Sequence, residues 1–128
     1  MSEPCPFCSP DREILLEEPD AYAIFDGYPV SKGHALVIPN RHVASIFDLT
    51  WKEQEACALL VGDVKDYLLD HYAPDGFNIG FNDGKAAGQT VFHSHIHVIP
   101  RYQGDLEDPE GGLRQLMPGK GSYRSPKG

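Results

Sequence analysis

Short apolar runs, each ended by glycine, proline, aspartate or asparagine, recur along the chain and predict β-strands. Such runs occupy residues 21–25, 34–38 and 77–82. Between the second and third runs, apolar residues recur at helical spacing behind a Thr50-x-x-Glu53 capping box. This pattern predicts a long helix over about Trp51 to Tyr72. Strands joined by turns around one long helix indicate an α+β domain with a mainly antiparallel sheet.

Histidine occupies the alternate positions 93, 95 and 97 of a last predicted strand, which ends at Pro100. Successive side chains of a strand face opposite sides, so the three imidazoles are expected to share one face. Ile96 and Val98 then face the core. Imidazoles repel one another when protonated, so their clustering indicates a site for a metal, an anion or catalysis. The alternative is an exposed polar strand face without a function.

The composition narrows the class of protein. A chain of 128 residues with 41% apolar residues fits one domain, residues 1–128, with a core at about 5–101 and a tail at 102–128. A net charge of −8 disfavours nucleic acid as a partner, because nucleic acids are bound by basic patches. The longest apolar run, 56–61, is too short to span a membrane. Three cysteines and no visible secretory signal predict a cytoplasmic location.

A glycine-punctuated loop, 83–90, leads directly into the histidine segment. Glycine lets the backbone approach a ligand closely, so the amides of Gly88, Gln89 and Thr90 suit phosphate oxygens. Neutral imidazole is a better nucleophile than water near pH 7, so a neighbouring histidine is suited to attack phosphorus and form a phosphoramidate. A flanking imidazolium would bind the phosphate or protonate the leaving group.

The order of these motifs resembles the histidine triad (HIT) family of nucleotide hydrolases and transferases, over about residues 5–101. The resemblance rests on His-x-His-x-His followed by two apolar residues, on the preceding Gly88-Gln89-Thr90-Val91, and on segments 33–39 and 82–84. Ser94 departs from the family, which usually has an apolar residue there. The resemblance implies a HIT-like α+β fold with a mainly antiparallel sheet of about five strands, one long helix and a short C-terminal tail. It also implies a homodimer.

Residue by residue, the resemblance implies that His95 is the nucleophile that becomes nucleotidylated. It implies that His97 contacts the phosphate and assists the leaving group, and that Asp26 accepts hydrogen bonds from the ribose hydroxyls. The rest of the implied nucleotide site is Asn82, Gly88, Gln89, Thr90, Val91 and His34. The implied substrate is an adenosine nucleotide, AMP-X or a dinucleoside polyphosphate, from which AMP is released. Mg²⁺ would accompany a polyphosphate substrate.

Cys5 and Cys8 form a Cys-x-x-Cys turn, a spacing that chelates zinc when two further ligands are supplied. The turn resembles that of some bacterial HIT proteins and of the galactose-1-phosphate uridylyltransferases, which implies His42 and His93 as these ligands. Structural zinc there would tie the N-terminal segment to the histidine strand and support His95. The alternatives are a thioredoxin-like redox pair and two free thiols.

Two other functions fit the same residues. In one, the triad itself binds a catalytic zinc ion that activates water, so that the protein is a metallohydrolase. In the other, the protein binds nucleotides in a regulatory role, without meaningful turnover. The sequence favours the nucleotidyl-histidine enzyme over both, because only that function uses the glycine-rich loop together with the triad.

Overall fold

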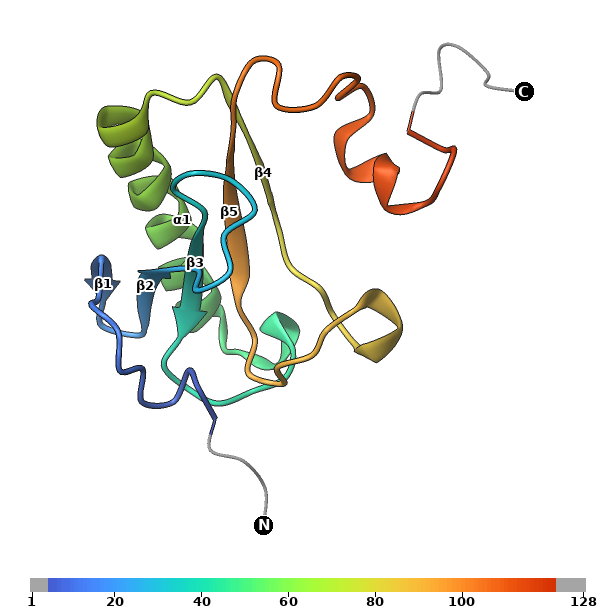
Figure 1. The fold of residues 1–128 in the computed structure, drawn as a ribbon. Helices are drawn as coiled ribbons and strands as arrows, with labels where there is room; N and C mark the ends of the chain where they lie inside the picture. Colours follow the sequence, from blue (N-terminus) through green and yellow to red (C-terminus); the bar gives the residue numbers. More distant parts are fainter. Residues whose placement is uncertain (1–4, 122–128) are drawn as a thin grey trace.

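The computed structural model describes residues 5–121, so the outermost parts of the predicted domain and tail, 1–4 and 122–128, lie outside the described residues. One sheet contains five strands in the order β1-β2-β3-β5-β4, with every neighbouring pair antiparallel (Figure 1). The strands are β1 (Leu16–Glu18), β2 (Ala21–Phe25), β3 (Ala35–Pro39), β4 (Gly76–Gly80) and β5 (Ile96–Arg101). The helices are α1 (Trp51–Tyr72) and the short 3₁₀ turns η1 (Ile46–Asp48), η2 (Lys85–Ala87) and η3 (Gly112–Leu116). The predicted class, sheet and long helix are confirmed.

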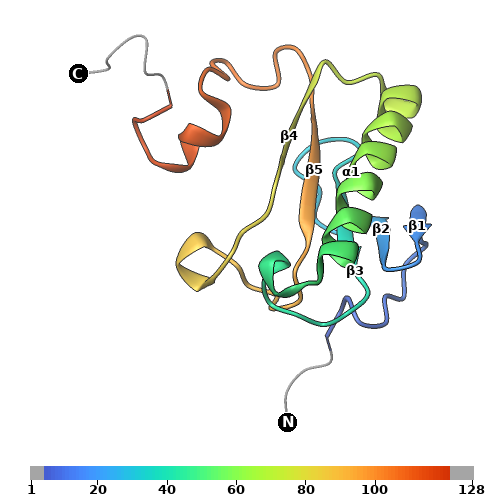
Figure 2. The same ribbon diagram turned by 180° about the vertical axis from the view of Figure 1, so that it is seen from behind.

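Helix α1 packs across one face of the sheet (Figures 1 and 2). Its buried residues, Cys57, Leu60, Val64 and Leu68, recur at helical spacing and join the inward-facing strand residues in one core. Burying each large aliphatic side chain contributes about 1.5–3 kcal/mol, so this stripe is the main attachment of the helix. No helix within residues 5–121 is both long enough and apolar enough to cross a membrane.

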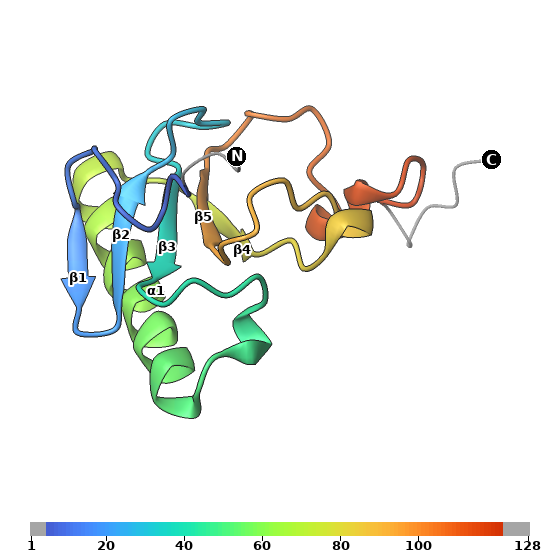
Figure 3. The ribbon, with the colours of Figure 1, turned by 90° about the horizontal axis from the view of Figure 1, so that it is seen from below.

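The opposite face of the sheet is covered in part by the N-terminal segment (Figure 3). The ring of Phe7 packs there with Tyr22, Ile24, Leu36 and Ile38. Strands β2 and β3 are therefore buried on both faces, which explains why their sequences are continuous apolar runs rather than alternating ones. The remainder of this face is open and carries the histidine cluster.

The structure corrects the start of the histidine strand. Strand β5 begins at Ile96, whose first partner in β3 is Val37, and not at position 93. The amide of Ser94 donates to the carbonyl of Val43 at 2.7 Å, which holds residues 93–95 outside the sheet ladder. The expectation of three imidazoles on one face of one strand is therefore wrong. Ile96 and Val98 do face the core, as predicted.

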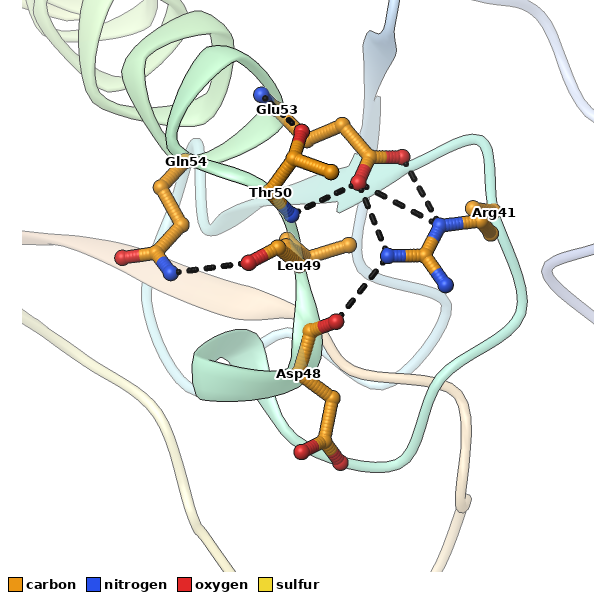
Figure 4. A network of polar contacts seen from close by, with 6 residues as sticks. All are labelled: Arg41, Asp48, Leu49, Thr50, Glu53 and Gln54. Atoms are coloured by element: carbon orange, nitrogen blue, oxygen red, sulfur yellow. Dashed lines mark hydrogen bonds and ion pairs between the residues drawn. The ribbon is translucent and has the colours of Figure 1, made fainter.

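A polar network holds the N-terminus of α1 (Figure 4). The Thr50 hydroxyl accepts from the amide of Glu53 at 3.2 Å, and the Thr50 amide donates to the Glu53 carboxylate at 2.8 Å, so the predicted capping box is confirmed. Arg41 donates to both oxygens of Glu53 and to the carbonyl of Asp48. The Arg41 guanidinium is the main reason that the pKa of Glu53 falls to about 2. The network anchors the segment that also carries His42.

Replacing Glu53 by glutamine removes the charge that pairs with Arg41 and is expected to lower the free energy of unfolding by up to about 1 kcal/mol near pH 7, the upper value for an exposed ion pair. The depressed pKa makes this stabilisation present above the ordinary value of 4.5 and lost as the pH falls toward about 2. Urea denaturation of both proteins across that range measures the difference. Glu55→Gln, on an exposed position of the same helix, is the matched control, and an equal loss there would contradict the role of the network.

Candidate active site and metal site

A cavity of about 750 Å³ opens on the sheet face opposite α1. Its volume lies within the usual range for sites that bind small molecules, about 300–1,000 Å³. All of the residues that the sequence predicts to be catalytic or nucleotide-binding line this cavity: Asp26, His34, Asn82, Gly88, Gln89, Thr90, Val91, His95 and His97. The chain brings them together from β2, β3, β5 and the loop between β4 and β5.

Other lining residues were not identified from the sequence: Pro6, Phe7, Arg12, Gly27, Tyr28, Val30 and Leu36. The sequence could have indicated Phe7, because it lies between Cys5 and Cys8. A metal bound by those two cysteines would also fix the position of the Phe7 ring. The Phe7 ring lies 5.0 Å from the His95 ring, centroid to centroid.

His95 is held by the backbone of its own segment. Its Nδ1 lies 2.9 Å from the carbonyl oxygen of His93. A carbonyl oxygen only accepts hydrogen bonds, so Nδ1 carries the ring proton and Nε2 keeps its lone pair. The ring of His97 lies 5.2 Å away, centroid to centroid. An imidazole oriented in this way presents an unprotonated nitrogen, which is the requirement for a nucleophile.

His34 and His97 form a second oriented pair. The amide of Val30 donates to Nδ1 of His34 at 3.1 Å, so neutral His34 carries its proton on Nε2. This Nε2 lies 3.0 Å from Nδ1 of His97 and 3.4 Å from Oδ2 of Asp26. His97 therefore accepts at Nδ1 and carries its own proton on Nε2. The pair presents a hydrogen-bond donor, not a second nucleophile.

Burial keeps this pair neutral near pH 7. It is the main reason that the pKa of His34 and that of His97 lie below the ordinary value of 6.5, because the charged form loses its hydration. The positive charges that His95 and His34 acquire on protonation lower the pKa of His97 further. The Asp26 carboxylate opposes these effects in both cases.

Gly33 sets the position of His34. Its φ of +92° is a conformation that favours glycine, and an added Cβ would lie 3.1 Å from Cδ2 of Tyr72 and 3.3 Å from Cγ of Pro100. Both the backbone conformation and the close packing therefore require glycine at this position. The tight approach places the start of β3 beside the end of β5.

Gln89 shapes the loop before the histidines. Its side chain, 4% exposed, accepts from the amide of Gly84 at 2.8 Å and donates to the carbonyls of Ala44 and Val91 at 2.8 and 3.1 Å. Both amide protons are thus used within the protein. Gly88, with a φ of +94°, makes the turn that follows η2. The side chain of Gln89 therefore holds the loop, and backbone groups are left to face the cavity.

A second cluster lies beside the cavity, on the other side of Phe7. Cys5, Cys8, His42 and His93 each contribute one ligand atom, and these atoms lie within 4.8 Å of one another. Nδ1 of His93 is 3.2 Å from Sγ of Cys5, and Nδ1 of His42 is 3.0 Å from Sγ of Cys8. Nε2 of His93 donates to the carbonyl of Pro39 at 2.7 Å, so its Nδ1 lone pair faces the thiols. Two sulfur and two nitrogen donors in this arrangement fit tetrahedral zinc.

The chain is similar in sequence to proteins of one known family. Residues 9–104 match the family model described as the HIT domain. The chain is 39% identical over 87 residues to an uncharacterized HIT-like protein of Mycoplasma genitalium, a match that covers 68% of this chain. The chain spans only 62% of that relative's length. It is 37% identical over 103 residues to a bis(5'-adenosyl)-triphosphatase of Dictyostelium discoideum, with 80% of this chain and 69% of that protein covered.

Solved structures give the same result. A Zn-bound histidine triad family protein from Mycobacterium smegmatis superposes with a TM-score of 0.71 at 36% identity. The superposition covers 81% of this chain and 77% of that one. Both the family model and the fold lead to one conclusion: the chain belongs to the histidine triad (HIT) family.

Proposed function

We propose that the protein is a nucleotide hydrolase or transferase that releases AMP from AMP-X or dinucleoside polyphosphate substrates through a covalent nucleotidyl-His95 intermediate. The observation that carries this proposal is the orientation of His95, whose Nδ1–H donates to the carbonyl of His93 at 2.9 Å. An unprotonated Nε2 is thereby held beside a cavity of nucleotide size. The name of the Dictyostelium relative, a bis(5'-adenosyl)-triphosphatase, supports the substrate class.

The reaction takes two steps. Nε2 of His95 attacks the α-phosphorus, the N–P bond forms, and the P–O bond to the leaving group breaks with its electron pair going to that oxygen. His95 becomes cationic, and the carbonyl of His93 stabilises it through the Nδ1 proton. The Nε2 proton of His97 bonds the developing negative charge on oxygen. Water then attacks the phosphorus, a P–O bond forms, and the N–P bond breaks with its electron pair returning to Nε2 of His95. The proton lost by the water goes to solvent and AMP is released, whereas another acceptor in place of water makes the protein a transferase.

The binding groups divide between ribose and phosphate. Oδ1 of Asp26 accepts from the amide of Tyr28 at 2.8 Å, which leaves lone pairs of the carboxylate for the ribose hydroxyls. Asn82 and the backbone of the loop around Gly88 and Thr90 would bind the phosphate oxygens. Mg²⁺ would accompany a polyphosphate substrate and neutralise part of its charge.

The cluster of Cys5, Cys8, His42 and His93 would hold structural zinc. The geometry of its donors and the Zn-bound relative from Mycobacterium smegmatis support this assignment. Zinc, when bound, would cross-link three segments through four ligands: two from the N-terminal turn, one from the segment after β3 and one from the segment before β5. The retention of two thiolates is consistent with the proposed cytoplasmic location.

We further propose that residues 1–128 act as one domain and assemble as a homodimer. Strand β4 lies at the edge of the sheet, so one row of its backbone groups is available for pairing. The adjacent helix α1 exposes Leu59 and Leu69, which are 56% and 42% accessible. A second copy packed against this helix and strand edge would bury these side chains.

A triad-bound catalytic zinc ion is disfavoured by the position of His93. Its Nε2 is bonded to the carbonyl of Pro39 and its Nδ1 faces the thiols, so it is turned away from a metal shared with His95 and His97. Asp26, His34 and His97 also lie close enough to share an ion. However, the proton on Nε2 of His34, required by the amide of Val30, occupies the lone pair that such an ion needs.

The proposed function is tested by capture of the intermediate. Short incubation of the protein with diadenosine triphosphate, followed by quenching in base, is expected to yield an adenylylated peptide that contains His95, because phosphoramidates are labile in acid. Mass spectrometry of the digest locates the added AMP. Steady release of AMP without any labelled peptide, or a label on another residue, contradicts the covalent mechanism. Tight AMP binding without turnover of any adenylylated compound supports the regulatory alternative.

A further inference from the structure

The Cys5–Cys8 turn belongs to two sites at once. Pro6 and Phe7, between the cysteines, line the nucleotide cavity. The Phe7 ring packs against His95, with centroids 5.0 Å apart, and contacts His93 edge-on at 6.1 Å. The flanking thiols provide two of the four donors in the metal cluster. A change at the thiols is therefore expected to displace Pro6 and Phe7 in the wall of the cavity.

His93 is a second connection between the sites. Its Nδ1 faces the sulfur atoms of Cys5 and Cys8, at 3.2 and 3.5 Å. Its carbonyl oxygen accepts the Nδ1 proton of His95. One residue thus holds a ligand atom of the metal cluster and the group that orients the proposed nucleophile, and it is itself fully buried.

The thiols are accessible and close enough to join. Cys8 is exposed and Cys5 is half-buried. The amide of Cys8 bonds the carbonyl of Cys5 at 3.4 Å, which closes a four-residue turn. Such a turn brings its end Cα atoms within about 7 Å, near the separation that a disulfide spans. Cys57, by contrast, is buried in the core beneath α1.

We propose that the Cys5–Cys8 pair is a redox-sensitive site whose oxidation by a peroxide releases the metal and weakens nucleotide binding. The inference rests on the proposed function for its nucleotide readout. In the balanced step, the two thiolates give two electrons to hydrogen peroxide, the S–S bond forms and the O–O bond breaks. Two protons from solvent complete two molecules of water. His42 and His93 alone would be too few ligands to hold a zinc ion, so formation of the disulfide would abolish the metal site.

The expected consequence of oxidation is a lower affinity for the nucleotide. Without the metal site, the Phe7 ring is no longer held against His95. The carbonyl of His93, which orients His95, is also held less firmly. The dissociation constant for AMP is expected to rise about three- to tenfold, the effect of losing one aromatic contact. Dithiothreitol with Zn²⁺ is expected to restore the original value. Methionine sulfoxide is not reduced by that treatment, so recovery separates the disulfide from damage at Met117.

The test uses the full chain loaded with zinc. Hydrogen peroxide is added, Zn²⁺ release is followed with a chromogenic chelator, and AMP binding is measured by calorimetry before and after. One Zn²⁺ released per disulfide formed, with weaker AMP binding, supports the inference. Cys57→Ala is expected to respond like the native protein. Phe7→Ala is expected to bind AMP more weakly from the start and to change little on oxidation.

Two failures are distinguishable. If the reduced, zinc-loaded protein binds no AMP, the proposed function fails together with the inference. If AMP binds with the same dissociation constant before and after complete oxidation, only the inference is overturned. Retention of zinc through peroxide treatment, or oxidation confined to Cys57, also overturns it.

Discussion

Replacing His95 by asparagine is expected to reduce AMP release from diadenosine triphosphate at least about 1,000-fold, since loss of a nucleophile removes the main reaction path. Asparagine is of similar size and polarity, but its amide nitrogen has no basic lone pair with which to attack phosphorus. The contact of Nδ1 with the carbonyl of His93 positions the native ring for that attack. The rate constant kcat at saturating substrate measures the effect.

The control for this variant is His71→Asn. His71 lies at the exposed C-terminal end of α1, where it stacks on Tyr67 at 3.9 Å and does not line the cavity. Its replacement is expected to leave kcat unchanged. AMP binding by His95→Asn should stay within a few-fold of the native value, because the other binding groups remain. Turnover retained by His95→Asn at the native rate would exclude His95 as the nucleophile.

Removal of zinc is expected to lower the stability by about 4 kcal/mol when free Zn²⁺ otherwise exceeds its dissociation constant 1,000-fold. The cluster joins three segments that are distant in the sequence, around Cys5, His42 and His93, so the metal binds the folded chain far better than the unfolded one. The melting temperature should fall by about 10 °C or more on chelation. Calorimetry with and without a strong chelator measures this difference.

Variants of the cysteines distinguish the effect of losing zinc from other effects of the chelator on stability. Cys8→Ser should bind less than one zinc per chain and melt near the temperature of the chelated native protein. Cys57→Ala should retain one zinc per chain and respond to the chelator like the native protein, because Cys57 lies in the core under α1. Equal melting temperatures of the native protein with and without the chelator would refute structural zinc.

Much of the fold was predictable because its signals are local. The Thr50–Glu53 capping box and the helical spacing of Leu60, Val64 and Leu68 predict α1 with its observed bounds. Strand β1, Leu16–Glu18, was missed because it is short and largely polar, and only its pairing with β2 defines it. Contacts of this kind are not encoded in the pattern of the strand itself.

The sequence identified nine of the sixteen residues that line the cavity, but it did not predict the different orientations of the three histidines. The sequence places His93, His95 and His97 at equal spacing and predicts the same face for all three. In the structure, bonds from the surrounding loops end the sheet ladder at Ile96, and His93 turns to the thiols. These contacts come from residues about 50 to 90 positions away, so no local pattern contains them.

By itself, the sequence determined the fold class, the long helix and the Cys-x-x-Cys turn, because each depends on residue type and short-range spacing. Only the tertiary structure decided which nitrogen of each imidazole carries the proton. The carbonyls of His93 and Pro39 and the amide of Val30 make that choice for His95, His93 and His34. The ring nitrogen that carries the proton of a neutral imidazole is decided by whether its neighbour is a hydrogen-bond acceptor or a donor. The folded backbone places that neighbour.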